Sequence, residues 1–454
     1  MLTSRQVDAT KGPLIPSILR YAIPLILSTI IQSLFNAVDL AVLGNMASPT
    51  AVASVGATVN ISSLLVTFFV GISGGVTILL ARYIGADSEE KTRTTVSTAV
   101  ISSVAFGMMI TVLGLFFSPL FLDLTHCPAD CYEGALLYIR IYVCGAPAIT
   151  LYNFSSAILT SSGDTKRPLY YMMISGLLNL VLNVLLCLLL PNKIVAVAIA
   201  TVTTQLLGAI LCVRRLCTMD GLCRLELRKL TWDIRYFGRI LRMGAPLALA
   251  NILYPIAGLQ IQTALNSFGS AAIAGSSAAS TLNQFPGALN SSFSTATGVF
   301  MGQNLGAEQH DRVKRSLLHT LWMLTALCVA ICVLFCLSSD LLFSLLLGAE
   351  STDAIAAAKL HQLTTTLFYV LPGIASILGS AIQCFGYPTV SSVTSITCVL
   401  GVRVVWTLWV FPKMPTLLCL FACYPVSWIF QIAANTLFFL FFYRRYKKGK
   451  YKRL

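Results

Sequence analysis

Residues 22–45 read AIPLILSTIIQSLFNAVDLAVLGN, an apolar stretch with a single carboxylate, Asp39. About 20 apolar residues cross a bilayer as a helix, so this stretch is long enough to span a membrane. Three polar residues precede Asp39 in steps of four, four and three, which places them on its face of the helix: Ser28, Gln32 and Asn36. A charge at the bilayer centre costs about 2.5–3.5 kcal/mol on insertion scales, so this face is predicted to line a protein interior or an ion pathway. The alternative is that Asp39 only hydrogen-bonds a neighbouring helix.

The composition of the whole chain is that of an integral membrane protein. Of its 454 residues, 56% are apolar and 11% are charged, and the mean hydropathy is +0.81, far from the values of soluble domains. The apolar segments lack the alternating pattern of a membrane β-barrel. We therefore predict an all-α membrane protein with twelve transmembrane helices, over residues 14–43, 51–80, 94–118, 135–161, 169–190, 194–213, 240–267, 273–300, 316–338, 358–384, 388–411 and 416–443.

The net charge of +14 follows the membrane topology and does not indicate a nucleic-acid partner. If the N-terminus lies in the cytoplasm, most of the 31 Lys and Arg residues fall in cytoplasmic segments, in agreement with the positive-inside rule. Both termini are then cytoplasmic, and the first apolar run is too long for a cleaved signal peptide. Of the 17 acidic residues, only Asp39 lies within a predicted span, which makes it the strongest candidate for an ion-coupling group.

Two short repeats indicate a duplicated six-helix unit. Residues 18–24 (ILRYAIP) match residues 240–246 (ILRMGAP), and residues 81–86 (ARYIGA) match residues 302–307 (GQNLGA). Because six crossings are an even number, both copies enter the membrane from the same side, which predicts lobes related by a pseudo-two-fold axis along the membrane normal. We predict an N-terminal lobe over 1–213, a cytoplasmic linker with an interfacial helix over 214–239, a C-terminal lobe over 240–443 and a basic cytoplasmic tail over 444–454.

Three local patterns concern helix placement. The interfacial helix is predicted from the helical spacing of Trp232, Arg235, Tyr236 and Arg239. Gly71 and Gly75 form a GxxxG pattern, which in a membrane predicts close helix packing. Pro24 and its repeat partner Pro246 are hinge candidates, because proline removes a helix hydrogen bond and can kink the helix. The alternative is that these prolines only shape the helix entry.

Polar residues in spans five and six lie at the depth of Asp39. Counted from the outer ends of their spans, Asp39, Asn183 and Thr201 lie six to eight residues deep, which is roughly 9–12 Å at 1.5 Å per residue. A carboxylate among amide and hydroxyl oxygens can hold a monovalent cation or take up a proton. Singly, each Asn or Thr has the alternative of an interhelical hydrogen bond. The predicted cation-coupling group, with Na⁺ possible at its carboxylate, is Asp39, Asn153, Asn179, Asn183 and Thr201.

Short motifs are spread over most of the chain. They are Asn36-x-x-Asp39, Val42-x-Gly44, Gly85-Ala86, Gly163-Asp164-Thr165-Lys166 with Pro168, Asn179-x-x-x-Asn183, Ala200-Thr201 with Gln205, and Asn266-x-Phe268-Gly269. Together these motifs resemble the multidrug and toxic compound extrusion (MATE) family, in its bacterial type. The resemblance implies twelve helices in two lobes, alternating access, and export of amphipathic, often cationic compounds driven by H⁺ or Na⁺. It also implies that the cation site lies in the N-terminal lobe.

Two departures from the family pattern bear on the coupling ion. The family often has an acid where this chain has Asn183, and a tyrosine where it has Phe35. A site with one carboxylate favours protonation over Na⁺. Arg403 is the one Lys or Arg that lies inside a predicted span and not near the end of one, and we predict a structural anchor, with substrate contact as the alternative. The candidates for the substrate cavity are Gln32, Phe35, Asn36, Gln205, Gln260, Gln262 and Asn266.

The sequence leaves two alternatives to an exporter. A flippase for a lipid-linked precursor would share the two-lobe architecture but would be expected to keep several cations for a phosphate cargo. A membrane enzyme would need a catalytic constellation, and the four histidines lie in or near loops without an HExxH or paired-acid spacing. We predict no enzyme activity and no cofactor beyond the coupling ion. We expect a monomer in the bacterial cytoplasmic membrane with small-molecule substrates; Cys127 and Cys131 could form a disulfide but are expected to be free thiols.

Overall fold

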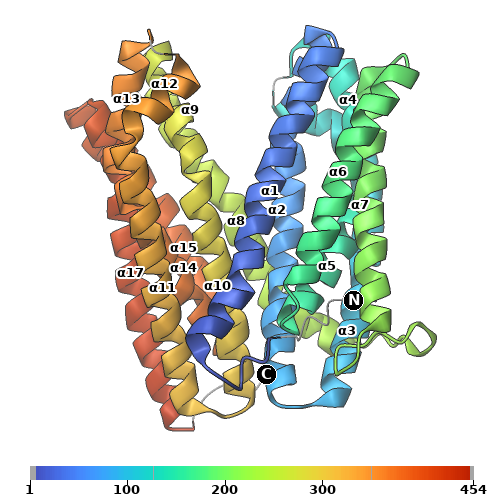
Figure 1. Cartoon of the computed structure of the whole chain (residues 1–454). Helices are drawn as coiled ribbons and strands as arrows, with labels where there is room; N and C mark the ends of the chain where they lie inside the picture. Colours follow the sequence, from blue (N-terminus) through green and yellow to red (C-terminus); the bar gives the residue numbers. More distant parts are fainter. Residues whose placement is uncertain (1–6, 126, 349, 450–454) are drawn as a thin grey trace. The chain divides into compact units, whose positions relative to one another are not determined.

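The computed structural model describes residues 7–125, 127–348 and 350–449, apart from the side chains of 36–41, 60, 124 and 254–256. The described residues form helices joined by loops, of which the longest connects α7 to α8, and there is no strand among them (Figure 1). Predicted spans one to six correspond to α1 (Leu14–Met46), α2 (Pro49–Gly85), α3 (Glu89–Leu124), α4 (Ala129–Cys144) with α5 (Ala146–Ser161), α6 (Lys166–Leu189) and α7 (Lys193–Thr218). The later spans comprise α8 (Ile234–Asn266), α9 (Ser270–Leu282), α10 (Gln284–Gly306), α11 (His310–Leu337), α12 (Ser339–Leu347), α13 (Thr352–Thr364), α14 (Val370–Cys384), α15 (Pro388–Ser395), α16 (Val402–Val405) and α17 (Leu417–Lys447).

The chain is an all-helical membrane protein. Within the described residues, ten helical segments are long and apolar enough to cross a membrane, and α4 with α5, bent by 48°, gives an eleventh. Gly145 and Pro147 lie at this bend, where proline cannot donate a helix hydrogen bond. The remaining predicted span, 273–300, is divided between α9 and α10. It is richer in Ser, Thr, Asn and Gln than the other spans.

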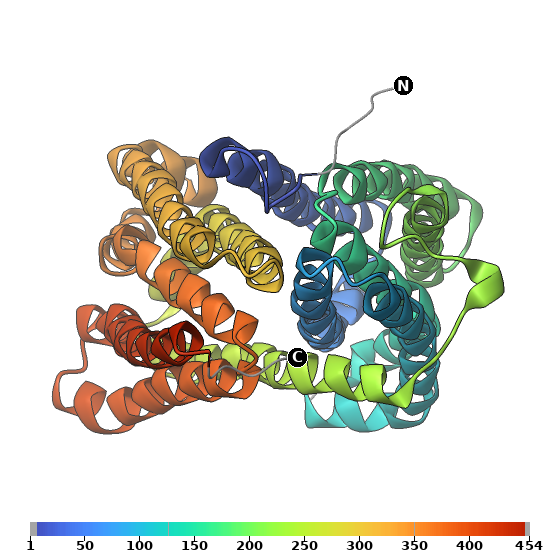
Figure 2. The ribbon, with the colours of Figure 1, turned by 90° about the horizontal axis from the view of Figure 1, so that it is seen from below.

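The chain folds into two compact units. The first comprises Leu27–Gly244 with the N-terminal residues through Asp8, and the second comprises Ala9–Ile26 and Ala245–Leu454. Viewed from below (Figure 2), each unit is a bundle of helices. Two helices change unit along their length, α1 after Ile26 and α8 after Gly244. The hinge candidates Pro24 and Pro246 each lie two residues from these changes.

The start of α8 is held in the first unit by close backbone contact with α2. A methyl group on Gly75 would lie 2.4 Å from the Gly244 nitrogen, and one on Gly244 would lie 2.5 Å from the Ile72 carbonyl oxygen. Small residues are what allow membrane helices to approach this closely. The close packing predicted from the GxxxG pattern is therefore present at Gly75. Arg239 adds a hydrogen bond from Nη1 to the Tyr83 hydroxyl at 2.9 Å.

The start of α1 is held in the second unit. The ring of Tyr21 meets Phe300 of α10 edge-on at 5.7 Å between centroids, and both side chains are fully buried. Just before the helix, the Ala9 N–H donates to Gln303 Oε1 at 3.2 Å, and Asn304 Nδ2 donates to the Ala9 carbonyl at 3.1 Å. Both helices that change unit are thus anchored on one side of their proline.

The basic segment between α7 and α8 packs on the first unit. Arg235, Tyr236 and Arg239 lie in the first turns of α8, which continues to Asn266, rather than on a separate interfacial helix. Trp232 donates from Nε1 to Ser102 Oγ at 3.1 Å. Lys229 and, to a smaller extent, Arg93 hold the pKa of the Glu226 carboxyl below its usual range. These contacts attach the segment to α3.

Candidate functional site

Three polar side chains form a buried hydrogen-bonded chain between α6 and α7 of the first unit. Asn183 Nδ2 donates to Asn179 Oδ1 at 3.1 Å, and Asn179 Nδ2 donates to Thr204 Oγ1 at 3.3 Å. Their exposed fractions are 0%, 7% and 4%, respectively. Thr204 in turn donates to the Ala200 carbonyl at 2.9 Å. The two predicted asparagines are therefore hydrogen-bonded to each other, and Thr204 extends this chain from α6 to α7.

The side chains of Asp39 and Asn36 lie outside the described residues, but the backbone around them is helical and its flanks are described. One turn before position 39, the Phe35 ring lies against Gly176 of α6, where an added methyl group would come within 1.9 Å of it. One turn after, Leu43 belongs to a buried cluster with Cys187 of α6. Positions 35, 39 and 43 share a helix face. The backbone of α1 thus contacts α6 before position 39, and after it α1 shares a buried cluster with α6 and other helices of the first unit.

The asparagines lie between the same two anchors on α6. Gly176, Asn179, Asn183 and Cys187 follow in steps of three, four and four, and so occupy one face of that helix. Gly176 provides the room for Phe35, since any side chain there would collide with the ring. The contact face of α6 therefore carries the hydrogen-bonded chain at the level of position 39.

Two other predicted coupling residues are bonded within their own helices. Thr201 Oγ1 donates to the Val197 carbonyl at 3.0 Å, and Asn153 Nδ2 donates to the Ile149 carbonyl at 2.8 Å. Both side chains are partly buried. Threonine and asparagine often satisfy a polar group in this way inside membrane helices. Thr204, which sequence reasoning missed, supplies the contact to Asn179 instead.

The predicted cavity residues are divided between the units. In the first unit, Gln32 is exposed and Gln205 is partly buried. In the second, Gln262 donates from Nε2 to Asn266 Oδ1 at 3.0 Å, with both residues exposed. Gln260 has a buried Oε1 that accepts no hydrogen bond from the described residues. A shared cavity formed by these residues stays a prediction.

Arg403 is buried inside the second unit, with 3% of its surface exposed. Its guanidinium stacks over the Tyr424 ring at 4.5 Å, and its Nε donates to Ser427 Oγ at 3.4 Å. Both partners lie on α17, so the arginine connects α16 to α17. This packing favours the predicted structural role.

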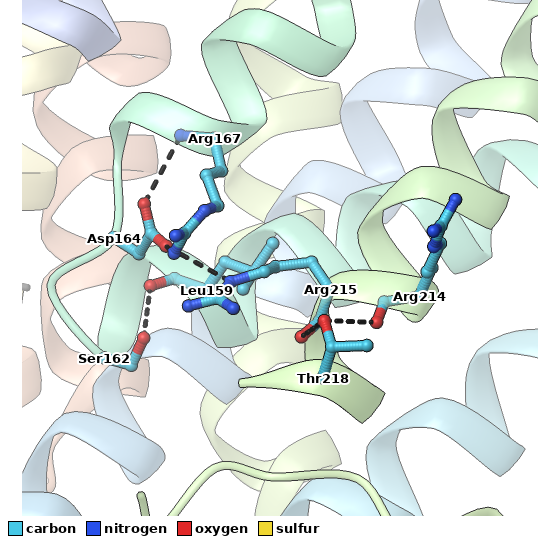
Figure 3. A network of polar contacts seen from close by, with 7 residues as sticks. All are labelled: Leu159, Ser162, Asp164, Arg167, Arg214, Arg215 and Thr218. Carbon is cyan, nitrogen blue, oxygen red and sulfur yellow. Dashed lines mark hydrogen bonds and ion pairs between the residues drawn. The ribbon is translucent and has the colours of Figure 1, made fainter. Parts of the chain in front are cut away.

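A second acid of the first unit is engaged in a different network, at the end of α5 (Figure 3). Asp164 is 3% exposed and accepts hydrogen bonds from Arg167, at 2.5 Å from Nη1 and 3.3 Å from the backbone nitrogen. Arg215 Nε of α7 lies 3.7 Å from the same carboxylate. Asp164 therefore ties α5, α6 and α7 together as an ion-paired structural residue.

The contrast between Thr204 and Thr201 gives a test of the buried chain. Thr204→Val removes the acceptor of the Asn179 amide, whereas Thr201→Val removes a hydroxyl bonded only to its own helix. We expect Thr204→Val to lower the unfolding free energy by about 0.6–1.7 kcal/mol more than Thr201→Val, since about 0.6 is the mean and about 1.7 the maximum measured for hydrogen bonds between membrane helices. Thermal unfolding of both purified variants in detergent measures the difference. Equal losses would contradict the assigned contact.

Comparison with known proteins gives a match to one family model and to several transporters. The MatE family model matches residues 24–185 and 246–409, once in each half of the chain. The chain is 27% identical over 418 residues to the probable multidrug resistance protein YoeA of Bacillus subtilis (strain 168), covering 89% of both chains. It is 19% identical over 380 residues to the multidrug export protein MepA of Staphylococcus saprophyticus, covering 83% of both.

Solved structures show the same fold. The crystal structure of MATE in the bent conformation is similar with a TM-score of 0.88 and 21% identity, over 99% of this chain and 100% of that chain. The crystal structure of MATE in the straight conformation is similar with a TM-score of 0.86 and 22% identity, over 98% and 99%. At these identities the likeness concerns the fold alone.

Proposed function

Because the chain belongs to the MatE family of transporters, we propose that it exports amphipathic, cationic compounds in exchange for inward-moving H⁺, with Na⁺ as the alternative coupling ion. Members of this family are transporters and not enzymes, and its antiporters couple to H⁺ or Na⁺. The choice of ion, the substrate class and the cytoplasmic placement of both termini are parts of this proposal. The flippase alternative differs in its cargo and is separated by the transport assay below.

The observation that carries the proposal is the packing of α1 near α6 around position 39. Phe35 lies against Gly176 before it, and Leu43 and Cys187 belong to one buried cluster after it, which supports a position for residue 39 at the level of Asn179 and Asn183. We assign Asp39 as the residue that exchanges H⁺ for a cationic substrate. While ionised it attracts the substrate, and once protonated it no longer does.

The neighbouring polar residues supply oxygen atoms to this site. In the proposal, Asn179, Asn183 and Thr204 form its rigid wall, because their side chains are already joined by hydrogen bonds. Thr201 and Asn153 remain proposed members at its edge. One carboxylate with neutral oxygens binds a proton without further ligands, whereas Na⁺ would need several of these oxygens at once. H⁺ is therefore the preferred ion.

Alternating access requires that the ion favour one arrangement of the lobes, since a ligand of equal affinity for both states shifts nothing. The helix that carries Asp39 is also one that changes unit, two residues after Pro24. We propose Pro24 and Pro246 as the points where α1 and α8 bend during transport. The proposed cavity lining comprises Gln32, Phe35, Asn36, Gln205, Gln260, Gln262 and Asn266.

Purified protein in vesicles tests the function directly. A fluorescent cationic dye is followed under an imposed pH gradient and, separately, under an imposed Na⁺ gradient, with an anionic dye of similar size as the control. We expect the pH gradient to drive the cationic dye and to leave the anionic dye unmoved. Cationic dye movement that ignores both gradients would overturn the coupling, and transport of the anionic dye alone would overturn the substrate class.

A further inference from the structure

A cavity of about 510 Å³ lies in the second unit, and none of its lining residues belongs to the proposed coupling site. One wall is the start of α1, over residues 12–16, and the other is the first turns of α11. Three residues of α11 that carry or can carry a positive charge line it: Arg312, Arg315 and His319. The cavity is therefore a basic pocket between the ends of two membrane helices.

The two arginines of this pocket differ in the hydrogen bonds that their guanidinium groups make. Arg312 is committed to the chain, since Nε donates to the Ala9 carbonyl at 3.1 Å and Nη2 donates to the Lys11 carbonyl at 2.9 Å. The exposed guanidinium of Arg315 makes no hydrogen bond or ion pair with any residue that the structure describes. All its donors are thus available to a ligand in the cavity, and a guanidinium matches the geometry of a phosphate.

His319 adds a second ligand-facing group. Its Nδ1 lies 2.6 Å from the Arg315 carbonyl, which can only accept, so Nδ1 carries the proton. The other ring nitrogen is left for a ligand, and it becomes a donor when the ring is protonated. Asp311 lines the same cavity and is exposed in the first turn of α11, so the lining is net positive by one charge with the histidine neutral.

An apolar surface continues from the cations along the helices. Arg315, His319 and Trp322 follow in steps of four and three, so they share a stripe on α11. Trp322 is 74% exposed, and the neighbouring Leu318 is 45% exposed. Arginine followed by tryptophan is typical of the membrane interface. This arrangement fits a ligand with an anionic head and apolar chains better than a soluble anion.

We propose that this cavity binds the phosphate headgroup of an anionic phospholipid, with its acyl chains along Leu318 and Trp322. On the proposed topology, the lipid belongs to the cytoplasmic leaflet, where basic pockets between helices bind such headgroups. Arg315 is the main contact to the phosphate, and His319 is the second, with Nε2 of the protonated ring as the donor. The lipid closes the gap between α11 and the start of α1, and so stabilises the base of the helix that carries Asp39.

Native mass spectrometry of the full-length protein tests this binding without any transport measurement. The protein is incubated with phosphatidylglycerol or phosphatidylcholine, and the fraction that retains a lipid is compared for the wild type, Arg315→Gln and Lys314→Gln. Lys314 is an exposed neighbouring charge that does not line the cavity, and it serves as the matched control. We expect at least fivefold lower retention of phosphatidylglycerol in Arg315→Gln, with Lys314→Gln equal to the wild type.

Two further arms decide the source and the specificity of the ligand. Arg315→Lys keeps the charge and is expected to retain more phosphatidylglycerol than Arg315→Gln, and His319→Leu gives a second, independent reduction. Equal losses in Arg315→Gln and Lys314→Gln, or equal retention of both lipids by the wild type, would overturn the proposal. Glycerol 3-phosphate at millimolar concentration is expected not to displace the lipid, and displacement would make this a site for soluble anions.

Discussion

Export of a cationic dye under a pH gradient is expected to fall by about 100-fold in Asp39→Asn. Coupling free energies of about 1–3 kcal/mol between two sites correspond to about 5–150-fold changes in affinity, and this loss is near the upper end of that range. Asparagine keeps the size and hydrogen-bonding capacity of the side chain but cannot take up a proton and carries no charge. The proton then has no site whose occupancy changes the affinity for the substrate. Initial rates from vesicles with matched amounts of protein measure the loss.

The matched control for this substitution is Asp164→Asn. This residue is a buried acid of the first unit, and it is ion-paired to Arg167 and near Arg215. Its substitution leaves these arginines without their carboxylate, so thermal stability should fall while the dependence of efflux on pH is kept. Asp39→Asn should show the reverse. Export by Asp39→Asn at the wild-type rate under both gradients would end the proposed coupling.

The helices were predictable because their signal is local. Apolar runs of sufficient length in the sequence correspond to most of the spans. The assignment of Pro24 and its repeat partner Pro246 as hinges stays a prediction. The break between α9 and α10 was not predicted. Pro286 lies in the first turn of α10, where it cannot donate to the preceding turn, and Asn283 at the junction accepts a hydrogen bond from Thr366 at 2.7 Å. That partner is distant in the sequence.

Residue counts along a sequence give the level of a side chain along its helix but not its rotation about the helix axis. Residue counts placed Asn183 and Thr201 at similar levels, and the structure does bring Asn179 and Asn183 together. Thr201 and Thr204 are about 60° apart around the helix at 3.6 residues per turn. The packing of α7 on α6 decides which hydroxyl faces the asparagines. This packing depends on all contacts between the two helices, and residue counts along the sequence carry no information about those contacts.

Gly75→Leu is expected to have the largest effect on stability. Gly75 and Gly244 bring the backbones of α2 and α8 together, and a side chain atom at Gly75 would lie 2.4 Å from the Gly244 nitrogen. The helices must separate, and overpacking of this kind costs about 1–3 kcal/mol or more. Because α8 leaves the first unit directly after Gly244, its anchor before Pro246 is lost as well. Folded yield and thermal unfolding in detergent measure the loss.

Gly56→Leu is the control on the same helix. Nothing lies within 4 Å of a methyl group built there, so the leucine meets no backbone, and leucine favours a helix more than glycine does. Its unfolding temperature should equal or exceed that of the wild type. If both variants lose stability alike, α2 tolerates no large residue anywhere, and the contact with Gly244 is not the cause. If only Gly75→Leu lowers the unfolding temperature, the start of α8 depends on the contact with Gly244. The reason is that an added side chain meets the Gly244 backbone at position 75 and no neighbouring atom at position 56.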